Sequence, residues 1–267
     1  MYFNIYLISF LFILIMMSIV FLIAQKKKDN SIVDVFWGIG FCFISINAFL
    51  LASEYDKRKF LMLVMVLAWG IRLALYIYQR NKGKGEDFRY AAWRNEWGNK
   101  AAWIAFWKVF MLQGAFMFII SLPIMHVMYF SMQFGNLLDI FGLTVWLAGY
   151  MMEAIADRQM KMFKADSANK GKIIQHGLWS ISRHPNYFGE ILVWWGIFIV
   201  SLNADRWYLS IISPLVVTWL LSSVSGVPML ERKYKNNPDF QEYAAKVPAL
   251  VPNLDGWKKL WGMMFSS

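Results

Sequence analysis

Long apolar runs, broken by short polar and basic segments, set the pattern of this chain of 267 residues. A helix needs about 20 consecutive apolar residues to cross a bilayer. Seven runs approach or exceed that length, and we expect each to form one transmembrane helix. The pattern therefore predicts an all-α, polytopic membrane protein with seven transmembrane helices and a single integral-membrane domain over residues 1–267. The expected spans are residues 2–24, 32–52, 60–78, 101–130, 137–155, 187–202 and 207–227.

Basic residues gather in alternate polar segments. Lysine and arginine dominate the segments after the first, third and fifth spans, and they recur in the tail. Because cytosolic loops of membrane proteins are rich in these residues, the N-terminus is expected outside and the C-terminus in the cytosol. The run at 101–130 is long for one span, so we expect an interfacial helix leading into it and a kink at Pro123.

The composition favours a membrane protein and excludes several other classes. Hydrophobic residues make up 58% of the chain and the mean hydropathy is +0.42, which is too apolar for a soluble globular domain. The net charge of +10 comes from basic residues that cluster in alternate loops, where they indicate the orientation of the chain in the membrane. We therefore expect no nucleic-acid partner. A single cysteine excludes an internal disulfide. With three histidines, no HExxH and no Cys-His cluster, no protein-bound metal is expected, and soluble nucleotide-binding motifs are also missing from the sequence.

The stretch HGLWSISRHPNYFGE, residues 176–190, holds most of the polar chemistry in one place. Pro185 suits the first position of a helix, where a missing backbone N–H costs nothing. Asn186 and Glu190 lie four residues apart and therefore share one face of that helix. We expect this stretch to open the sixth span, with a buried carboxylate near the membrane edge.

Two basic residues, Arg183 and His184, stand just before this helix. Free backbone N–H groups and the positive end of the helix dipole favour an anion at that point. The arrangement predicts a binding site for a phosphorylated ligand. The alternative is an interfacial anchor, with Arg183 on lipid phosphate and with Trp179 and Tyr187 in the aromatic belt.

A second polar group surrounds the cytosolic end of the third span. Arg72 lies about two turns, or roughly 12 Å, inside that end and is expected to face a partner or a wet cavity, with snorkelling to lipid phosphate as the alternative. Tyr76 and Arg80 follow on the same helix. The next loop carries glycines, which let backbone approach a ligand closely, or it forms a network of its own side chains. Its candidate residues, with one further arginine, are Glu86, Asp87, Arg89, Tyr90 and Arg94.

A third polar group lies at the end of the fifth span. Glu153 falls within the apolar run and therefore needs a partner. A helical face just beyond it suits a pair of phosphates, or else forms a basic flank of the span. The residues of that face are Asp157, Lys161 and Lys164.

Asp34 falls in the first turn of the second span, with Trp37 one turn further on. A low dielectric favours the protonated form of such a carboxyl group. A neutral carboxyl group could donate a proton or a hydrogen bond to a substrate carbonyl. The alternative role is capping of the helix N-terminus, for which Ser31 is another candidate.

Three patterns, DVFW from Asp34, RNKGKGEDFRY from Arg80 and RHPNYFGE from Arg183, together resemble the bacterial branch of the steroid 5-alpha-reductase superfamily. The combination covers most of the chain from Ser31 onward. The resemblance implies a seven-helix enzyme that holds NADPH at its cytosolic side and reduces a carbon–carbon double bond in a lipid. The shorter pattern RHPxYxG also occurs in integral-membrane methyltransferases that act on isoprenylcysteine and phospholipids.

The resemblance also implies roles for single residues. In the related sterol reductases, a tryptophan, an asparagine and a tyrosine of the stretch that matches residues 176–190 touch the cofactor. These fall on Trp179, Asn186 and Tyr187. The basic pair before the pattern falls on Lys161 and Lys164. Further positions matched in the same way are Asp157, Glu231 and Tyr243.

The substrate end departs from the family pattern. The steroid enzymes carry a Gln-Glu pair in the second helix that binds the steroid ketone, and here Asp34 and Trp37 occupy the nearest stretch. The tyrosine that partners this glutamate falls near Trp69, with Tyr76 in reach on the same helix. The asparagine of their fifth helix falls on Glu153. A steroid is therefore one expected substrate among lipid enones.

We expect an NADPH-dependent oxidoreductase acting on CH–CH groups, in the bacterial inner membrane, with its cofactor site facing the cytosol. Its partners would be a lipid or steroid substrate and membrane lipids, and the pattern predicts no particular oligomeric state. The alternatives are a methyltransferase using S-adenosylmethionine, which has no phosphate and less use for basic loops, and a non-enzymatic lipid-binding or transport protein. The expected catalytic residues are Asp34, Trp37, Tyr76 and Glu190. The expected cofactor-binding residues are Arg72, Arg80, Glu86, Asp87, Arg89, Tyr90, Arg94, Glu153, Asp157, Lys161, Lys164, Trp179, Arg183, His184, Asn186, Tyr187, Glu231 and Tyr243.

Overall fold

The computed structural model describes residues 2–130, 135–253, 255–258 and 262 of the chain. Helices make up most of these ranges, and no residue in them lies in a strand. The all-α prediction is therefore confirmed. Six helical segments among the described residues are long and apolar enough to cross a membrane. They are Asn4–Lys27, Ile32–Leu50, Lys57–Asn81, Phe88–Phe130, Leu137–Ala165 and Trp207–Tyr234.

The sixth predicted span, residues 187–202, is not one of these six segments and corresponds to the helix α9, Pro185–Ser201. Its 17 residues make it shorter than any of the six candidate spans. That length is at the lower end of what a crossing helix needs. The total of seven spans and the orientation of the two termini stay predictions.

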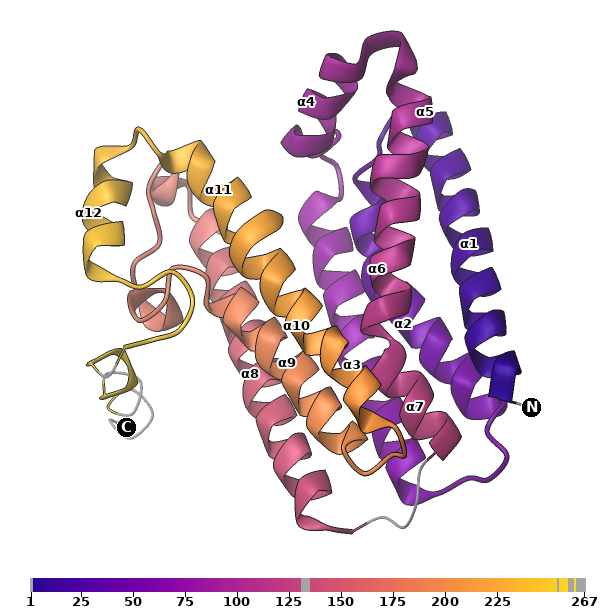
Figure 1. Ribbon diagram of the computed structural model, residues 1–267. Coiled ribbons are helices and arrows are strands. Elements are labelled where there is room, and N and C mark those ends of the chain that lie inside the picture. The colour runs from indigo at the N-terminus through magenta and orange to yellow at the C-terminus, as the bar shows by residue number, and fades with distance from the viewer. Residues whose placement is uncertain (1, 131–134, 254, 259–261, 263–267) are drawn as a thin grey trace. The chain divides into compact units, whose positions relative to one another are not determined.

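The chain forms two compact units. Unit 1 comprises Met1–Ile140 and Ile197–Ser213, and unit 2 comprises Phe141–Gly196 and Pro214–Ser267. Both units are built from helices (Figure 1). The helices of unit 1 are α1 (Tyr2–Lys27), α2 (Ile32–Leu50), α3 (Lys57–Asn81), α4 (Phe88–Trp97), α5 (Ala101–Ala105), α6 (Leu112–Ile120) and α7 (Leu122–Phe130). Those of unit 2 are most of α8 (Leu137–Ala165) and of α9, most of α10 (Ile212–Trp219), and α11 (Val227–Tyr234) and α12 (Pro238–Lys246).

Glycines allow α2 and α3 to pack closely in unit 1. A Cβ atom on Gly38 would lie 2.4 Å from the carbonyl oxygen of Gly70. Small residues at a crossing let the backbones of two membrane helices approach each other. Beside this crossing, the buried rings of Phe41 and Trp69 meet edge to face, with centroids 5.7 Å apart. The crossing therefore fixes the two helices that carry most of the predicted catalytic residues.

The predicted long span at 101–130 is the last part of one helical stretch, Phe88–Phe130. A π-helical turn at Phe106–Met111 interrupts its regular α-helical geometry. The stretch breaks at Ser121, so that Pro123 falls in the first turn of α7, where a proline needs no backbone N–H. The predicted kink is therefore present as the break between α6 and α7.

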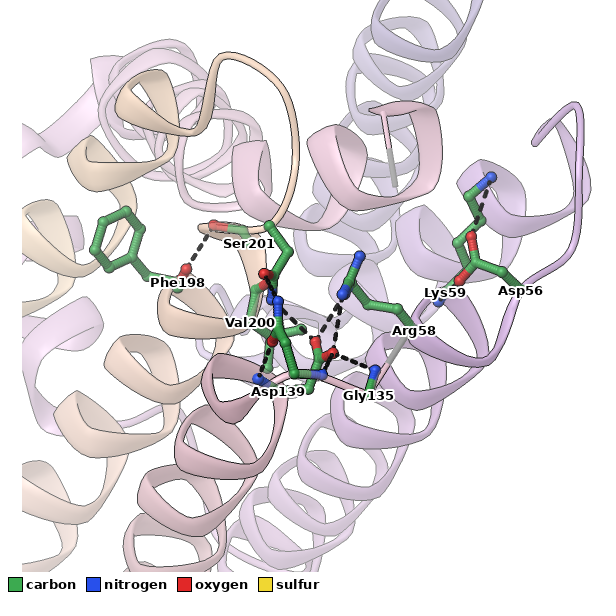
Figure 2. Close-up of polar contacts among 10 residues, drawn as sticks. Asp56, Arg58, Lys59, Gly135, Asp139, Phe198, Val200 and Ser201 are labelled. Atoms are coloured by element: carbon green, nitrogen blue, oxygen red, sulfur yellow. Dashed lines mark hydrogen bonds and ion pairs between the residues drawn. The ribbon is translucent and has the colours of Figure 1, made fainter. Parts of the chain in front are cut away.

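A buried ion pair stands where the sequence predicts a polar loop. The helix α3 begins at Lys57, earlier than expected, and it buries Arg58. Arg58 Nε and Nη2 donate to the two carboxylate oxygens of Asp139 at 2.7 and 2.9 Å, and each side chain is 1% exposed (Figure 2). The Gly135 N–H and Asn203 Nδ2 also donate to Asp139, at 2.9 and 3.1 Å. Each carboxylate oxygen of Asp139 therefore accepts two of these donors, as a buried charge requires.

Glycines also bring α8 and α9 together in unit 2. A Cβ atom on Gly189 would lie 2.6 Å from the backbone nitrogen of Glu153 and 2.7 Å from the carbonyl oxygen of Gly149. Seven residues further along α9, a Cβ atom on Gly196 would lie 2.6 Å from the backbone nitrogen of Trp146. The close approach therefore continues over two turns of both helices. It sets the polar residues at the start of α9 against the cytosolic half predicted for α8.

Candidate functional site

In unit 1, Asp34 of α2 is bound to two residues of α4. Tyr90 OH donates to Asp34 Oδ1 at 2.6 Å, and Arg89 Nη2 donates to Oδ2 at 2.9 Å. Gln113 Nε2 of α6 donates to the Tyr90 oxygen at 3.3 Å. Arg89 Nε donates in turn to Asp87 at 2.9 Å. The structure thus joins residues that the sequence placed in two separate candidate groups.

These contacts give Asp34 the surroundings of a carboxylate. It accepts hydrogen bonds from a guanidinium and from a phenol, and such bonds favour the ionised form. Burial favours the neutral form instead. The role of Asp34 as a proton or hydrogen-bond donor therefore stays a prediction. The alternative cap, Ser31, makes no side-chain hydrogen bond to the first turn of α2, because its hydroxyl donates to Asp29 at 2.5 Å.

Glu86 holds together the two polar loops of unit 1. It accepts hydrogen bonds from the Asn30 N–H at 2.7 Å and from Arg94 Nε and Nη2 at 2.9 and 2.8 Å. Burial alone would raise the pKa of Glu86, but the hydrogen bonds from Arg94 and Asn30 outweigh it and hold that pKa below its ordinary value. Of the two readings of this loop, these contacts favour a network of its own side chains.

The other predicted residues of unit 1 lie along α2 and α3. Arg80 is exposed, its Nε donates to Asn81 at 3.2 Å, and its guanidinium carbon lies 5.9 Å from the centre of the Tyr76 ring. Arg72 is partly buried two turns earlier on α3. Trp37 packs edge to face against a buried phenylalanine of its own helix, with ring centroids 5.3 Å apart. Trp37 therefore has a packing role in addition to its predicted catalytic one.

In unit 2, the close crossing of α8 and α9 places an amide against a carboxylate. Asn186 Nδ2 donates to Asp157 Oδ1 at 3.3 Å. Asp157 is buried, and so is Glu153 one turn earlier on α8. Lys161 and Lys164 follow on the same helix and are exposed. The start of α9 therefore sets an amide against a buried acid of α8, and two cations follow that acid on the same helix.

Trp179 and Tyr243 have their polar atoms bound within the chain. Trp179 Nε1 donates to the carbonyl oxygen of Ala156 at 3.2 Å, and its ring lies in a buried apolar cluster with Leu178 and other residues. Tyr243 OH donates to the carbonyl oxygen of Trp179, with that of Ser182 3.3 Å away. Both side chains therefore help to hold the segment that leads into α9. Their predicted cofactor contacts remain predictions.

Arg183, expected to bind phosphate at the start of α9, binds the C-terminal tail. Its Nε and Nη2 donate to the two carboxylate oxygens of Glu231 at 2.8 and 3.2 Å. Its Nη1 donates to the carbonyl oxygens of Ala244 and Val247 at 3.0 and 2.6 Å. His184 Nε2 lies 3.0 Å from Glu231 Oε1. All three nitrogens of the guanidinium are therefore engaged by α11 and the end of α12.

His184 gives the first testable prediction, a loss of stability on mild acidification. Burial lowers the pKa of His184 below its ordinary value of 6.5, although the hydrogen bond and charge of Glu231 act in the opposite direction. The unfolded chain therefore binds this proton more readily than the folded chain, and stability falls as the pH drops through about 6.5. Thermal unfolding measured between about pH 7.5 and about pH 5.5 should show it, above the range where carboxylates titrate.

The matched variants are His184→Gln and His176→Gln. The first should reduce this pH dependence, because it removes one titrating ring. The second changes an exposed histidine that packs against Phe163 and should keep it. Equal pH dependence in the wild type and in His184→Gln would contradict the prediction.

Some residues of these clusters carry signals that the sequence patterns did not use. Gln113 is a polar residue inside a predicted span, and such residues usually have a partner. The Asn30 N–H and the two carbonyl groups that accept from Arg183 are backbone atoms, which no sequence pattern identifies. The predicted site residues are divided between the two units. Those of unit 1 are Asp34, Trp37, Arg72, Tyr76, Arg80, Glu86, Asp87, Arg89, Tyr90 and Arg94, and those of unit 2 are Glu153, Asp157, Lys161, Lys164, Trp179, Arg183, His184, Asn186, Tyr187, Glu190, Glu231 and Tyr243.

Comparisons with known proteins give a family for the chain. A family model described as "Protein of unknown function (DUF1295)" matches residues 20–247. The uncharacterised protein C594.04c of Schizosaccharomyces pombe is 23% identical over 291 residues, which cover 95% of this chain and 81% of that protein. The probable O-methyltransferase ustE of Ustilaginoidea virens is 27% identical over 129 residues, which cover 47% of this chain and 40% of that protein. No solved structure matches the chain significantly. Because the family model spans most of the sequence, the chain belongs to the DUF1295 family.

Proposed function

We propose that this protein is an integral-membrane oxidoreductase that uses NADPH to reduce the carbon–carbon double bond of a lipid enone. A 3-oxo-Δ4-steroid is one such substrate. The observation that carries the proposal is the pairing of Asn186 with Asp157 beside two exposed lysines, in a chain whose three patterns resemble the steroid 5-alpha-reductase superfamily. We further propose the bacterial inner membrane as its location, with the nucleotide bound from the cytosol.

The charges of the predicted phosphate-binding residues fit this cofactor in part. Three of the predicted arginines are already paired with carboxylates of the chain: Arg89 with Asp34 and Asp87, Arg94 with Glu86, and Arg183 with Glu231. Lys161 and Lys164 are exposed near the end of α8 and would hold the phosphates. Phosphate recognition would thus rest on fewer groups than the sequence suggests.

Bound NADPH would supply the hydride. In unit 2, Asn186 is placed to hold a carboxamide, because its own amide is fixed by Asp157. In unit 1, Tyr76 would donate a hydrogen bond to the substrate carbonyl, since Asp34 is an acceptor in this structure. A single well-placed donor to a developing oxyanion is worth about 2.7–4 kcal/mol. Glu190 lies one turn after Asn186 on the same face of α9 and would help to orient the ligand.

A second candidate is a methyltransferase that uses S-adenosylmethionine. One specific observation favours it: the relative ustE carries the name probable O-methyltransferase. The pairing of three arginines with carboxylates also removes much of the cationic excess that would distinguish a nucleotide phosphate site. The sulfonium of S-adenosylmethionine carries a positive charge, so the buried acids Glu153 and Asp157 would suit it.

Ligand-induced stabilisation separates the two candidates and forms the second prediction. NADPH should raise the melting temperature of the full chain in detergent, because a ligand at 100 times its Kd stabilises the folded state by about 2.7 kcal/mol. S-adenosylmethionine should not. Asn186→Ala should abolish the NADPH effect, whereas Glu242→Gln, an exposed change in α12, should keep it.

Stabilisation by S-adenosylmethionine alone would reject the reductase and favour the methyltransferase. Stabilisation by neither would reject both. Where NADPH binds, a screen of ketosteroids and other enones, followed by loss of NADPH absorbance, identifies the substrate class.

A further inference from the structure

The C-terminal tail binds the segment that leads into α9 at several points in unit 2. Glu231 of α11 accepts two hydrogen bonds from Arg183 and lies 3.0 Å from His184 Nε2. Tyr243 of α12 donates to the carbonyl oxygen of Trp179. We call residues 179–187 the entry segment, because they lead into α9 and end with the predicted nicotinamide contacts Asn186 and Tyr187.

The backbones of the tail and the entry segment are also paired. The Arg183 N–H donates to the Pro248 carbonyl oxygen at 2.9 Å, and the His184 N–H donates to that of Ala249 at 3.0 Å. Side-chain and backbone bonds therefore converge on the same two residues. The polar side-chain atoms of Glu231 and Tyr243 are hydrogen-bonded to the entry segment. These side chains therefore have little remaining hydrogen-bonding capacity for a ligand.

The contact reaches Tyr187 through His184. The two rings are stacked, with an interplanar angle of 2° and centroids 5.3 Å apart. His184 is buried, and Glu231 fixes its Nε2. A substitution at Glu231 would therefore remove the contact that fixes the His184 ring against Tyr187. It would also remove the ion pair of Arg183, the residue before His184. Asn186 lies between these points on the first turn of α9.

We propose that Glu231 and Tyr243 are positioning residues, which order the entry segment and thereby place Asn186 and Tyr187, and that they do not touch the nucleotide. The resemblance to sterol reductases would make both of them cofactor contacts. This inference rests on the proposed function, because it concerns the ligand end held by Asn186 and Tyr187. It predicts that loss of the tail contacts weakens binding of the nicotinamide half alone.

The test compares Glu231→Gln and Tyr243→Phe with the matched control Glu242→Gln in the full chain in detergent. Glu231→Gln keeps the shape of the side chain but places an amide NH₂ against donors. Tyr243→Phe removes one hydroxyl. Glu242 is exposed, binds only Lys246 among the contacts shown by the described residues, and is the neighbour of Tyr243. Amide hydrogen exchange of the entry segment gives a readout that needs no ligand.

The expected result has three parts. Exchange in the entry segment becomes faster in Glu231→Gln and Tyr243→Phe but not in Glu242→Gln. The Kd for NADPH rises about tenfold or more in the first two, since small misplacements of binding groups carry costs of that size. The Kd for 2′,5′-ADP, which lacks the nicotinamide half, changes by less than about twofold, since that half of the ligand keeps its contacts.

Two results would overturn the proposal. Equal losses of affinity for NADPH and 2′,5′-ADP with unchanged exchange would make Glu231 a direct nucleotide contact. Faster exchange with an unchanged NADPH Kd would make the tail contacts structural only. A wild-type chain that binds no NADPH would reject the proposed function, and the exchange measurement in the same sample would still decide whether Glu231 orders the entry segment.

Discussion

Replacing Arg58 with alanine should lower the free energy of unfolding by about 3–5 kcal/mol, because removal of one partner leaves a buried charge without its counterion. Asp139 is 1% exposed, and neither Gly135 nor Asn203 carries a positive charge to replace the guanidinium. The loss should appear as a lower melting temperature of the detergent-purified protein and a smaller folded yield.

Two further variants sharpen this test. Lys57→Ala removes an exposed cation from the preceding residue of α3 and should have little effect. The double variant Arg58→Met with Asp139→Leu should recover much of the loss, since apolar residues of similar volume often replace a buried ion pair at little cost. A melting temperature for Arg58→Ala equal to that of Lys57→Ala would show that the pair contributes nothing.

The second large effect is expected at Gly189, where α9 meets α8. In Gly189→Val the added carbon atoms would lie under 3 Å from backbone atoms of Glu153 and Gly149, and these cannot move aside as the end of a flexible side chain could. Overpacking of this kind costs about 1–3 kcal/mol and sometimes more. The helices would separate, so Asn186 would also move away from Asp157. We therefore expect both a lower melting temperature and loss of NADPH-induced stabilisation.

The control for this change is Gly85→Ala. Nothing lies within 4 Å of a Cβ atom at Gly85, so the added methyl group has free space. That variant should melt close to the wild type. If Gly189→Val also melts close to the wild type, α8 and α9 do not cross as closely at Gly189 as the structure indicates.

The helices were the most predictable feature, because an apolar run of membrane length leaves the backbone little choice but to bond within itself. Their ends were less predictable. The sequence predicts a loop at Arg58, because a charged residue normally marks the end of a span. In the structure its ion pair with Asp139 accounts for its burial. The length of α9 leaves its role open, because 17 residues suit either a short span or a buried helix.

The candidate site was predictable as far as local spacing determines it. Asp157 and Asn186 were identified from patterns on two helices, and the structure joins them. The partners of the arginines were not predicted, because Arg89 and Asp34 are 55 residues apart and Arg183 and Glu231 are 48 apart. Spacing within a helix says nothing about contacts at such separations. The sequence therefore suggests Arg89 and Arg183 as phosphate ligands, whereas in the structure both are paired with carboxylates.

The order in which a ribosome makes this chain bears on the Arg58–Asp139 pair. Asp139 follows Arg58 by 81 residues. At roughly 5–20 residues per second, about 4–16 s of synthesis separate the two. During that interval the nascent arginine cannot enter the hydrocarbon together with its counterion, so this end of α3 must stay hydrated until α8 emerges. Closure of that end is therefore expected to be a late step of biogenesis, and chains truncated before α8 should be early targets of membrane proteases.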